Sequence, residues 1–270
     1  MNIVSNAKLL CKTNLSQLYL TPKNTIIKEV CKQINYKMEK YSLETLNNKN
    51  ITPKLLSTIE DDYFIYFEME YMKGGDLLEY ILMRDYKPYF EEDNSESITQ
   101  KKDFTTNNKF LLKSMINLLI KMREESIIHL DVKPENFIFT NTNRNDLRII
   151  DFGSSQTYNF DRQDTIRISS VIGTKFYTPP EYYWNEYIVY NSDIWSIGII
   201  MLILETGTNI FQKNRNFELS HIENQETLDD IIDEYVIENI ESNNLIKNML
   251  KLDYRERYDY DDILTHSYLN

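Results

Sequence analysis

One short segment of the chain brings together three side chains that could do chemistry. Between His129 and Asn136 stand an acid at Asp131, a cation at Lys133 and an amide at Asn136. The acid could accept a hydroxyl proton, the cation could contact a phosphate, and the amide could hold a metal ion. Pro134 disfavours a helix here, so these polar side chains are predicted to lie on a loop.

A second acidic position follows fifteen residues after Asn136. Asp151 begins the tripeptide Asp151-Phe152-Gly153, and the apolar run Leu147 to Ile150 before it is predicted to form a strand. The two motifs at this spacing resemble those of the eukaryotic-type protein kinases, in particular the serine/threonine protein kinases. The resemblance covers roughly Leu9 to Leu269 and is strongest from His129 to Arg257.

The resemblance implies a part in phosphoryl transfer for four side chains. Asp131 would be the catalytic base that orients the substrate hydroxyl, and Lys133 would neutralise charge on the transferred phosphoryl group. Asn136 and Asp151 would hold Mg²⁺, or Mn²⁺ in its place, against the phosphates of ATP. Loss of one such group is expected to cost roughly 10³-fold or more in rate.

An ATP site is implied as well. Lys28, in Ile26-Ile27-Lys28, resembles the strand lysine that holds the α- and β-phosphates, and Glu39 stands where the helix glutamate of the family pairs with that lysine. Met69 would be the gatekeeper residue. The other implied ATP contacts are the backbone of Glu70 to Met72, the ribose-facing Asp76, and the pocket walls at Cys11, Leu18 and Ile138.

The phosphate-binding turn departs from the family pattern. Kinases carry a glycine-rich turn here, whereas this chain has no glycine before Gly74, and Cys11, Thr13 and Ser16 stand where three glycines would be. Glycine lets backbone N–H groups approach phosphates closely and accepts positive φ. Small polar residues could still bend the chain, and their hydroxyls could donate hydrogen bonds. Ile26, in place of the family's alanine, is expected to narrow the adenine pocket.

Substrate docking is implied at two positions. Thr174 beside Lys133 resembles the serine/threonine-specific arrangement. Glu135, by resemblance to kinases that select basic residues before the target, predicts a basic protein substrate, in keeping with the net charge of -12. Leu130 replaces the arginine that in many kinases clamps a phosphorylated activation loop. Activity is therefore expected not to require phosphorylation of Ser170, which stands at the usual phosphosite.

Three further matches predict structural roles. His129 is expected to be a packed residue that supports the loop backbone, and Asp193 is expected to cap backbone groups near the catalytic loop. Glu181 and Arg257 are expected to form a buried ion pair, and breaking it would destabilise the fold strongly.

Composition narrows the class of protein. A net charge of -12 and an isoelectric point near 4.8 argue against sequence-independent nucleic-acid binding, which needs clustered Lys and Arg. Cys11 and Cys31 are too few for a disulfide framework, and their number does not suggest zinc. Ile194 to Leu204 is too short to span a bilayer and is predicted to be a buried core helix. Because Met1 to Lys12 lacks a signal-peptide pattern, an intracellular location, cytoplasmic or nuclear, is expected, without a membrane partner.

The elements around these motifs predict an α+β protein kinase fold with two lobes. Gly74-Gly75 separates a β-rich half from a helix-rich half, so one kinase domain over residues 1–270 is expected, with an N-lobe to about residue 72, a hinge at about 70–75 and a C-lobe from about 76. The predicted elements are strands at Ala7–Leu20, Asn24–Glu29 and Tyr63–Tyr71, a turn at Thr21–Asn24, helices at Tyr36–Leu46 and Phe110–Met122, and a loop insertion at Tyr86–Asn108.

The leading interpretation is transfer of the γ-phosphate of ATP to serine or threonine hydroxyls of proteins. The alternative is a pseudokinase, a binding or scaffold module, which the missing glycines and Ile26 favour. A kinase for small molecules is less favoured, because Thr174 to Glu181 resembles a peptide-docking segment. A nucleotide thermal shift with and without Mg²⁺ would separate the first two.

Overall fold

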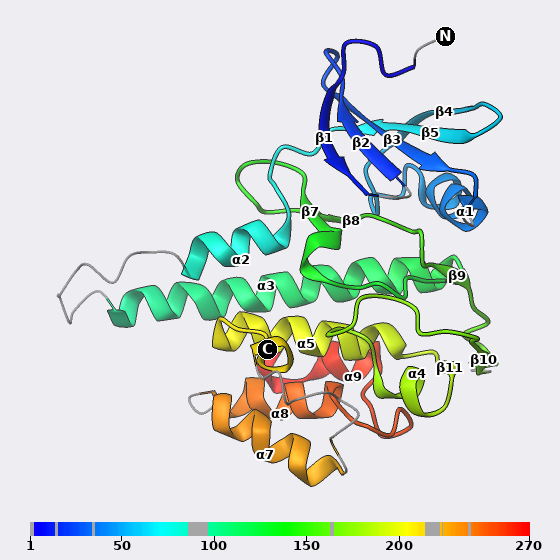
Figure 1. The fold of residues 1–270 in the computed structure, drawn as a ribbon. Coiled ribbons are helices and arrows are strands. Elements are labelled where there is room, and N and C mark those ends of the chain that lie inside the picture. Colours follow the sequence, from blue (N-terminus) through cyan, green and yellow to red (C-terminus); the bar gives the residue numbers. More distant parts are fainter. Residues whose placement is uncertain are drawn as a thin grey trace.

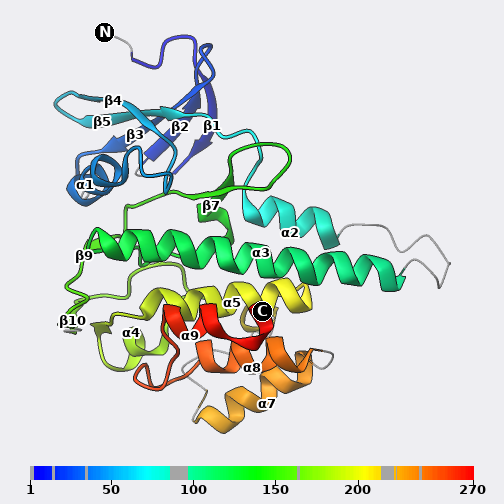
Figure 2. The same ribbon diagram turned by 180° about the vertical axis from the view of Figure 1, so that it is seen from behind.

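A computed structural model describes residues 3–13, 16–33, 36–85, 97–162, 165–213, 222, 224–236 and 239–270 of the chain (Figure 1). The N-terminal part is a β-sheet with one helix beside it, and the C-terminal part is mainly helical. In both views the sheet stands above the helices, with β7 (Phe137–Phe139) and β8 (Leu147–Ile149) between the two parts (Figure 2). The predicted α+β arrangement is confirmed.

The N-terminal sheet has five antiparallel strands in the order β1-β2-β3-β5-β4. The predicted turn at Thr21–Asn24 is confirmed, because the Asn24 N–H donates to the Thr21 carbonyl. The region Ala7–Leu20, predicted as strand, is two strands separated by a turn between Thr13 and Ser16, where the phosphate-binding turn was expected. The strands are β1 (Lys8–Lys12), β2 (Ser16–Leu20), β3 (Thr25–Cys31), β4 (Leu55–Glu60) and β5 (Phe64–Glu70).

Helix α1 (Tyr36–Leu46) begins and ends at the predicted residues. Residues three or four positions apart lie on one face of a helix, so Glu39 shares its face with Leu43 and Leu46. Both leucines are buried in the same core cluster as Phe67 of β5. Packing of this face against the sheet thereby fixes the position of Glu39.

The segment after β5, which is the predicted hinge, is joined to β7 by backbone hydrogen bonds. The Gly74 N–H donates to the Phe139 carbonyl at 3.1 Å, and the Phe139 N–H donates to the Gly75 carbonyl at 2.9 Å. A β-carbon on Gly74 would lie 2.3 Å from the carbonyl oxygen of Asn141, so only glycine fits this close approach. From the hinge the chain enters α2 (Leu77–Asp85).

The C-terminal part is built around α5, in which residues 192–204 are all buried. The predicted core helix Ile194–Leu204 is confirmed, and α3 and α8 pack against it. In the described part of the chain, no helix combines the length and the hydropathy needed to cross a membrane. The helices are α3 (Ser97–Glu124), α4 (Pro180–Trp184), α5 (Ser192–Thr206), α6 (Ile210–Lys213), α7 (Gln225–Tyr235), α8 (Ile240–Met249) and α9 (Tyr260–Thr265), with 3-10 turns at Pro134–Asn136 and Ser267–Leu269.

Helix α3 begins earlier than the sequence pattern predicts. The loop insertion predicted at Tyr86–Asn108 is wrong for residues 97–108, which belong to α3, while residues 86–96 lie outside the described residues. Neither proline nor glycine interrupts residues 97–108, so a polar composition was compatible with helix. Asn108 is buried and donates its amide to the Leu204 carbonyl at 3.1 Å, which fixes this part of α3 on α5.

Within the described residues, three two-stranded ribbons hold the segments that carry the polar motifs. The loop of residues 129–136, which the resemblance implies to be catalytic and which we call the catalytic loop, connects β6 to β7. Asp151 follows β8 closely, as predicted from the apolar run Leu147 to Ile150. The pairs are β6 (Ile127–Ile128) with β9 (Gln156–Thr157), β7 with β8, and β10 (Ile166–Arg167) with β11 (Tyr187–Ile188).

Candidate active site

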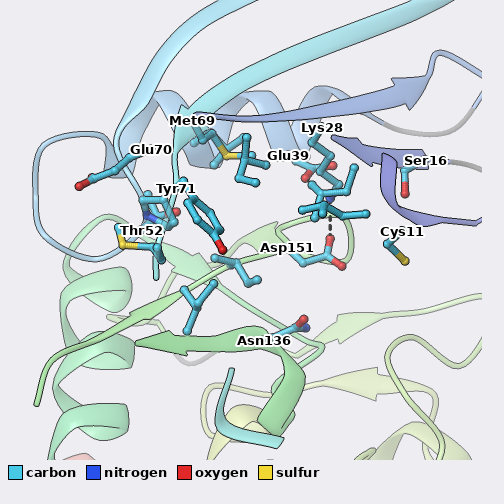
Figure 3. Close-up of a pocket in the computed structure, with 18 of the residues that line it drawn as sticks. Cys11, Ser16, Lys28, Glu39, Thr52, Met69, Glu70, Tyr71, Asn136 and Asp151 are labelled. Carbon is cyan, nitrogen blue, oxygen red and sulfur yellow. Dashed lines mark hydrogen bonds and ion pairs between the residues drawn. The ribbon is translucent and has the colours of Figure 1, made fainter. Parts of the chain in front are cut away.

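Lys28 on β3 and Glu39 on α1 form an ion pair, as predicted. The Lys28 ammonium group also lies 2.9 Å from Oδ1 of Asp151, and Figure 3 shows the three side chains converging on one wall of a cavity. Burial disfavours the charged form of Lys28, but the two carboxylates outweigh burial and raise its pKa. The cation is thereby held in one position at the border between the sheet and the β7–β8 ribbon.

Asp151 stays ionised at neutral pH. Its side chain is 46% exposed, and its backbone adopts a left-handed φ of +67°. The covered half of the side chain disfavours the charged carboxylate, but Lys28 lowers the pKa of Asp151 to about 2. A carboxylate with this pKa is available to a divalent cation over the whole physiological pH range.

The backbone of the catalytic loop is held by the carboxylate of Asp193, at the start of α5. Its two oxygens accept hydrogen bonds from the His129 and Leu130 N–H groups, each at 2.8 Å, so the predicted cap is confirmed. His129 is fully buried, and its Nε2 lies 3.1 Å from the Ile150 carbonyl oxygen. His129 therefore connects the catalytic loop to the segment just before Asp151, as a packed residue.

Asp131, Lys133 and Thr174 form one hydrogen-bonded group. The Thr174 hydroxyl donates to Oδ1 of Asp131 at 2.6 Å, and the Lys133 ammonium group contacts Oδ2 of Asp131 at 2.9 Å and the Thr174 oxygen at 2.8 Å. The predicted position of Thr174 beside Lys133 is confirmed. An acid, a cation and a hydroxyl thus converge at the point where a substrate hydroxyl could be oriented.

Asn136 and Asp151 are suited to hold a divalent cation. The amide nitrogen of Asn136 donates to the Asp131 carbonyl at 2.7 Å, which leaves its amide oxygen as the group that a cation can use. Asp151 contributes an ionised carboxylate, and both residues line the same cavity. Mg²⁺ usually takes one or two protein carboxylates and completes its shell with phosphates and water, so this donor set fits that ion.

The cavity has a volume of about 330 Å³ and lies between the N-terminal sheet and the β7–β8 ribbon (Figure 3). Asp76 is not among the residues that line it. Oδ1 of Asp76 accepts a hydrogen bond from the Glu79 N–H at 2.8 Å at the start of α2, and the ribose contact of Asp76 stays a prediction. Ile26, expected to narrow the pocket, also lines it. The predicted site residues that line the cavity are Cys11, Leu18, Lys28, Glu39, Met69, Glu70, Met72, Asn136, Ile138 and Asp151.

One wall of the cavity was not predicted from the sequence. Thr52 and Pro53 line it, although no motif marks them. Backbone hydrogen bonds hold their segment at both ends, from the Ile149 N–H to the Ile51 carbonyl at 2.9 Å and from the Glu70 N–H to the Lys54 carbonyl at 3.0 Å. These contacts arise from pairing between distant segments, so the local pattern carried no signal for them.

The activation segment, which runs from Asp151 to Glu181, is held by apolar packing. Leu130, which stands at the arginine position of the resemblance, is 5% exposed and belongs to this packing. The β10–β11 ribbon adds backbone hydrogen bonds, and Ser170 is exposed beyond it. The buried members of this cluster, which we name the Leu130 cluster, are Ile128, Leu130, Tyr158, Phe160, Ile168, Tyr182 and Ile188.

Glu135 carries a buried carboxylate oxygen. Its Oε2 has no hydrogen-bond partner among the described residues. The nearby Tyr177 has its pKa raised to about 12 by burial and by the negative charge of Glu135. Because an unpaired buried carboxylate oxygen is costly, this position favours a ligand group that can donate a hydrogen bond or supply a positive charge.

A buried ion pair anchors the end of the activation segment. Arg257 donates to Glu181 through two nitrogens, at 2.9 and 2.8 Å, and the predicted pair is confirmed. The guanidinium group is 0% exposed and also donates to the Asn191 and Lys251 carbonyls. The chain after Thr174 is therefore fixed to the helical core.

Comparisons with known proteins agree with this arrangement. CDPK-related kinase 3 of Arabidopsis thaliana is 30% identical over 230 residues, which is 84% of this chain and 35% of the relative. Myosin light chain kinase 2, skeletal/cardiac muscle, of Rattus norvegicus is 27% identical over 236 residues, 84% of this chain and 34% of the relative. The chain thus spans about a third of the length of these relatives.

A third relative covers a shorter part of the chain. The calcium/calmodulin-dependent serine/threonine-protein kinase 1 of Oryza sativa subsp. japonica is 33% identical over 153 residues, which is 56% of this chain and 22% of the relative. The family model named protein kinase domain matches residues 11–269, nearly the whole chain. Together with the five-stranded sheet, the helical C-terminal part and the cavity between them, this match shows that the chain belongs to the protein kinase family.

Proposed function

We propose that this chain transfers the γ-phosphate of ATP to serine or threonine hydroxyls of proteins. The observation that carries the proposal is the hydrogen-bonded group of Asp131, Lys133 and Thr174, which lies next to a cavity whose wall holds Lys28 and Asp151. The close grouping of these charged side chains supports the proposal, because phosphoryl transfer depends mainly on positioning and electrostatic stabilisation. We further propose that residues 1–270 work as one domain, with an N-lobe that ends near residue 72.

In the proposed mechanism, each side chain acts where its contacts place it. Oδ1 of Asp131, which accepts a hydrogen bond from the Thr174 hydroxyl, would accept one from the substrate hydroxyl and then its proton. Lys133, on the other oxygen of Asp131, would stabilise charge on the transferred phosphoryl group. Lys28 would hold the phosphates that remain on the nucleotide. Mg²⁺ bound by Asn136 and Asp151 would neutralise phosphate charge.

Phosphoamino acid analysis tests directly which type of substrate residue is phosphorylated. Purified protein is incubated with ATP and Mg²⁺ and a mixed basic protein substrate, and the labelled residues are separated after acid hydrolysis. Phosphoserine and phosphothreonine are expected. Label found only on tyrosine would contradict the proposed specificity.

The substrate is proposed to carry basic residues before the target hydroxyl. The buried Oε2 of Glu135 and the net charge of -12 support this choice. The test compares two peptides that differ only in having arginine or glutamate before the serine. We expect kcat/KM to favour the arginine peptide at least tenfold, and the preference to fall about tenfold in Glu135→Gln, which is the usual effect of losing one charge-assisted contact.

A matched control for Glu135→Gln is Glu256→Gln, which removes the same charge from an exposed position. This control should keep the arginine preference of the wild type. Equal rates on both peptides, or a preference for the glutamate peptide, would contradict a basic substrate.

Activity is proposed not to require phosphorylation of the activation segment. The Leu130 cluster and the β10–β11 ribbon hold this segment by apolar contacts and backbone hydrogen bonds, neither of which needs a phosphate. Protein treated with a phosphatase and then separated from it, and the variant Ser170→Ala, should both keep the wild-type rate within about twofold. A tenfold loss after either change would contradict this part of the proposal.

The competing function is that of a module that binds nucleotide or protein without phosphoryl transfer. The glycine-free turn between β1 and β2 favours it. A thermal shift with ATP and Mg²⁺, combined with an absence of phosphoryl transfer by a folded wild type, would support this function over catalysis. The two free cysteines, Cys11 and Cys31, support a reducing compartment, cytoplasmic or nuclear, for either function.

A further inference from the structure

The turn between β1 and β2 is closed by the side chain of Thr13. The Thr13 N–H donates to the Ser16 carbonyl at 2.9 Å, and the Ser16 N–H donates to the Thr13 hydroxyl oxygen at 3.0 Å. The two hydroxyl oxygens lie 3.1 Å apart. The Thr13 side-chain oxygen thus accepts a hydrogen bond from the backbone at the end of the turn, which a glycine at this position could not do because it has no side chain.

This turn forms part of the cavity wall. Thr13 and Ser16 line the cavity, and Figure 3 shows Ser16 and Cys11 on the same side of it as Asp151. The end of the cavity near Lys28 and Asp151 is the one proposed to receive phosphates. The Ser16 N–H is therefore close to where a nucleotide phosphate would lie.

A backbone N–H strengthens phosphate binding when it is free to point at the anion. The Ser16 N–H already donates to the Thr13 hydroxyl oxygen, so a phosphate could accept a hydrogen bond from this N–H only by replacing that oxygen. In a glycine-rich turn no side chain competes for that N–H. In this chain, a hydrogen bond from the Ser16 N–H to phosphate would add little to the free energy of nucleotide binding, because it would replace an existing hydrogen bond.

We propose that Thr13 is a positioning residue whose hydroxyl withholds the Ser16 amide from nucleotide phosphates. This inference rests on the proposed function and deepens it: the nucleotide is held mainly through its base at the hinge and through Lys28 and the metal ligands, and the Ser16 amide adds little for the phosphates. Removing the Thr13 hydroxyl should then release the amide and strengthen the recognition of ATP over adenosine.

The test measures binding of ATP and of adenosine by calorimetry in EDTA, so that neither metal nor catalysis contributes. Wild type is compared with Thr13→Val, which keeps the shape but loses the hydroxyl, and with Thr13→Ser, which keeps the hydroxyl. The ratio of ATP affinity to adenosine affinity should rise about tenfold in Thr13→Val, as expected for one released charge-assisted hydrogen bond. In Thr13→Ser the ratio should stay within twofold, and adenosine affinity should be the same in all three proteins.

An unchanged ratio in Thr13→Val would overturn the inference, and so would a lower ratio, because the hydroxyl would then contact the phosphates itself. Thr13 is exposed, so the substitution is not expected to affect folding, and Thr13→Ala serves as a second variant if the valine protein does not fold. If neither ATP nor adenosine binds to the folded wild type, the nucleotide site and the proposed function fail together with the inference. If both bind and only the ratio does not respond, the inference alone fails.

Discussion

The ammonium nitrogen of Lys28 lies 2.9 Å from Oδ1 of Asp151, across 123 positions of the sequence. The contact joins β3 of the N-terminal sheet to the segment that follows β8. A phosphate that entered the cavity would compete with Asp151 for this ammonium group, while Glu39 would keep the group in place. The relative position of the sheet and the β7–β8 ribbon thus determines how close the Lys28 and Asp151 charges lie to each other and to a bound nucleotide.

The pKa of Asp151 is predicted to depend on Lys28. In Lys28→Met the carboxylate of Asp151 loses its neighbouring cation, so the pKa should rise from about 2 toward the ordinary carboxyl value of about 4. Because the folded-state pKa in wild type is depressed, the contact stabilises the fold above about pH 4 and is lost as the pH falls toward 2. Carboxyl carbon NMR of aspartate-labelled protein would follow the titration.

The control for this titration is Lys32→Met, since Lys32 pairs with Glu60 at 2.9 Å and no hydrogen bond or ion pair between it and Asp151 is found among the described residues. Asp151 should titrate near pH 2 in the control as in the wild type. A wild-type Asp151 that titrates near 4 would contradict the account of the Lys28 contact.

Loss of one partner of the Glu181–Arg257 pair is predicted to destabilise the fold strongly. Arg257→Ala would leave the buried Glu181 carboxylate without its cation, and the free energy of unfolding should fall by about 3–5 kcal/mol. Urea unfolding followed by far-UV circular dichroism measures the change. Arg255→Ala is the matched control, because the pair of Arg255 with Asp253 is exposed to solvent and should contribute little to stability. Equal losses in both variants would show that burial does not govern the contribution of the pair.

Gly173 is predicted to position Thr174. It adopts a φ of +87°, and a β-carbon there would lie 2.5 Å from the Leu130 carbonyl oxygen. Gly173→Ala should therefore push the activation segment away from the catalytic loop and lower kcat by roughly tenfold or more, because catalysis is sensitive to displacements of about 1 Å. Steady-state kinetics at saturating ATP tests this, with Ser169→Ala as an exposed control in the same segment. Normal turnover by Gly173→Ala would show that this close approach is not needed.

The sequence predicted the parts of the site that depend on local patterns. The position of Glu39 in the kinase resemblance identified it as the partner of Lys28, and the two polar motifs with their flanking apolar runs located Asp131 and Asp151. The positions that depend on contacts between distant segments were not predictable in this way. Thr52 became part of the cavity wall through backbone pairing of its segment with β8 and with the end of β5. Polar composition also led to a wrong prediction at residues 97–108, which belong to α3 and whose last residue, Asn108, is hydrogen-bonded to α5.

At the turn between β1 and β2, the sequence predicted the residue types but not their hydrogen bonds. The absence of glycine was evident from the sequence, and so was the position of Thr13 and Ser16. The hydrogen bond from the Ser16 N–H to the Thr13 hydroxyl oxygen could not be predicted from the residue types. The same two residues could equally have directed their hydroxyls toward a ligand.

The measurement that tests the central claim most directly is γ-phosphate transfer from labelled ATP, with Mg²⁺, to a basic protein substrate by wild type and by Asp131→Asn. Both proteins are first compared by thermal unfolding, so that a loss of fold is not mistaken for a loss of chemistry. The account predicts transfer by wild type and a loss of roughly 10³-fold or more in Asp131→Asn at similar stability. A folded wild type that transfers no phosphate, or an Asp131→Asn variant that matches its rate, would contradict the assignment of this site as a phosphoryl-transfer centre.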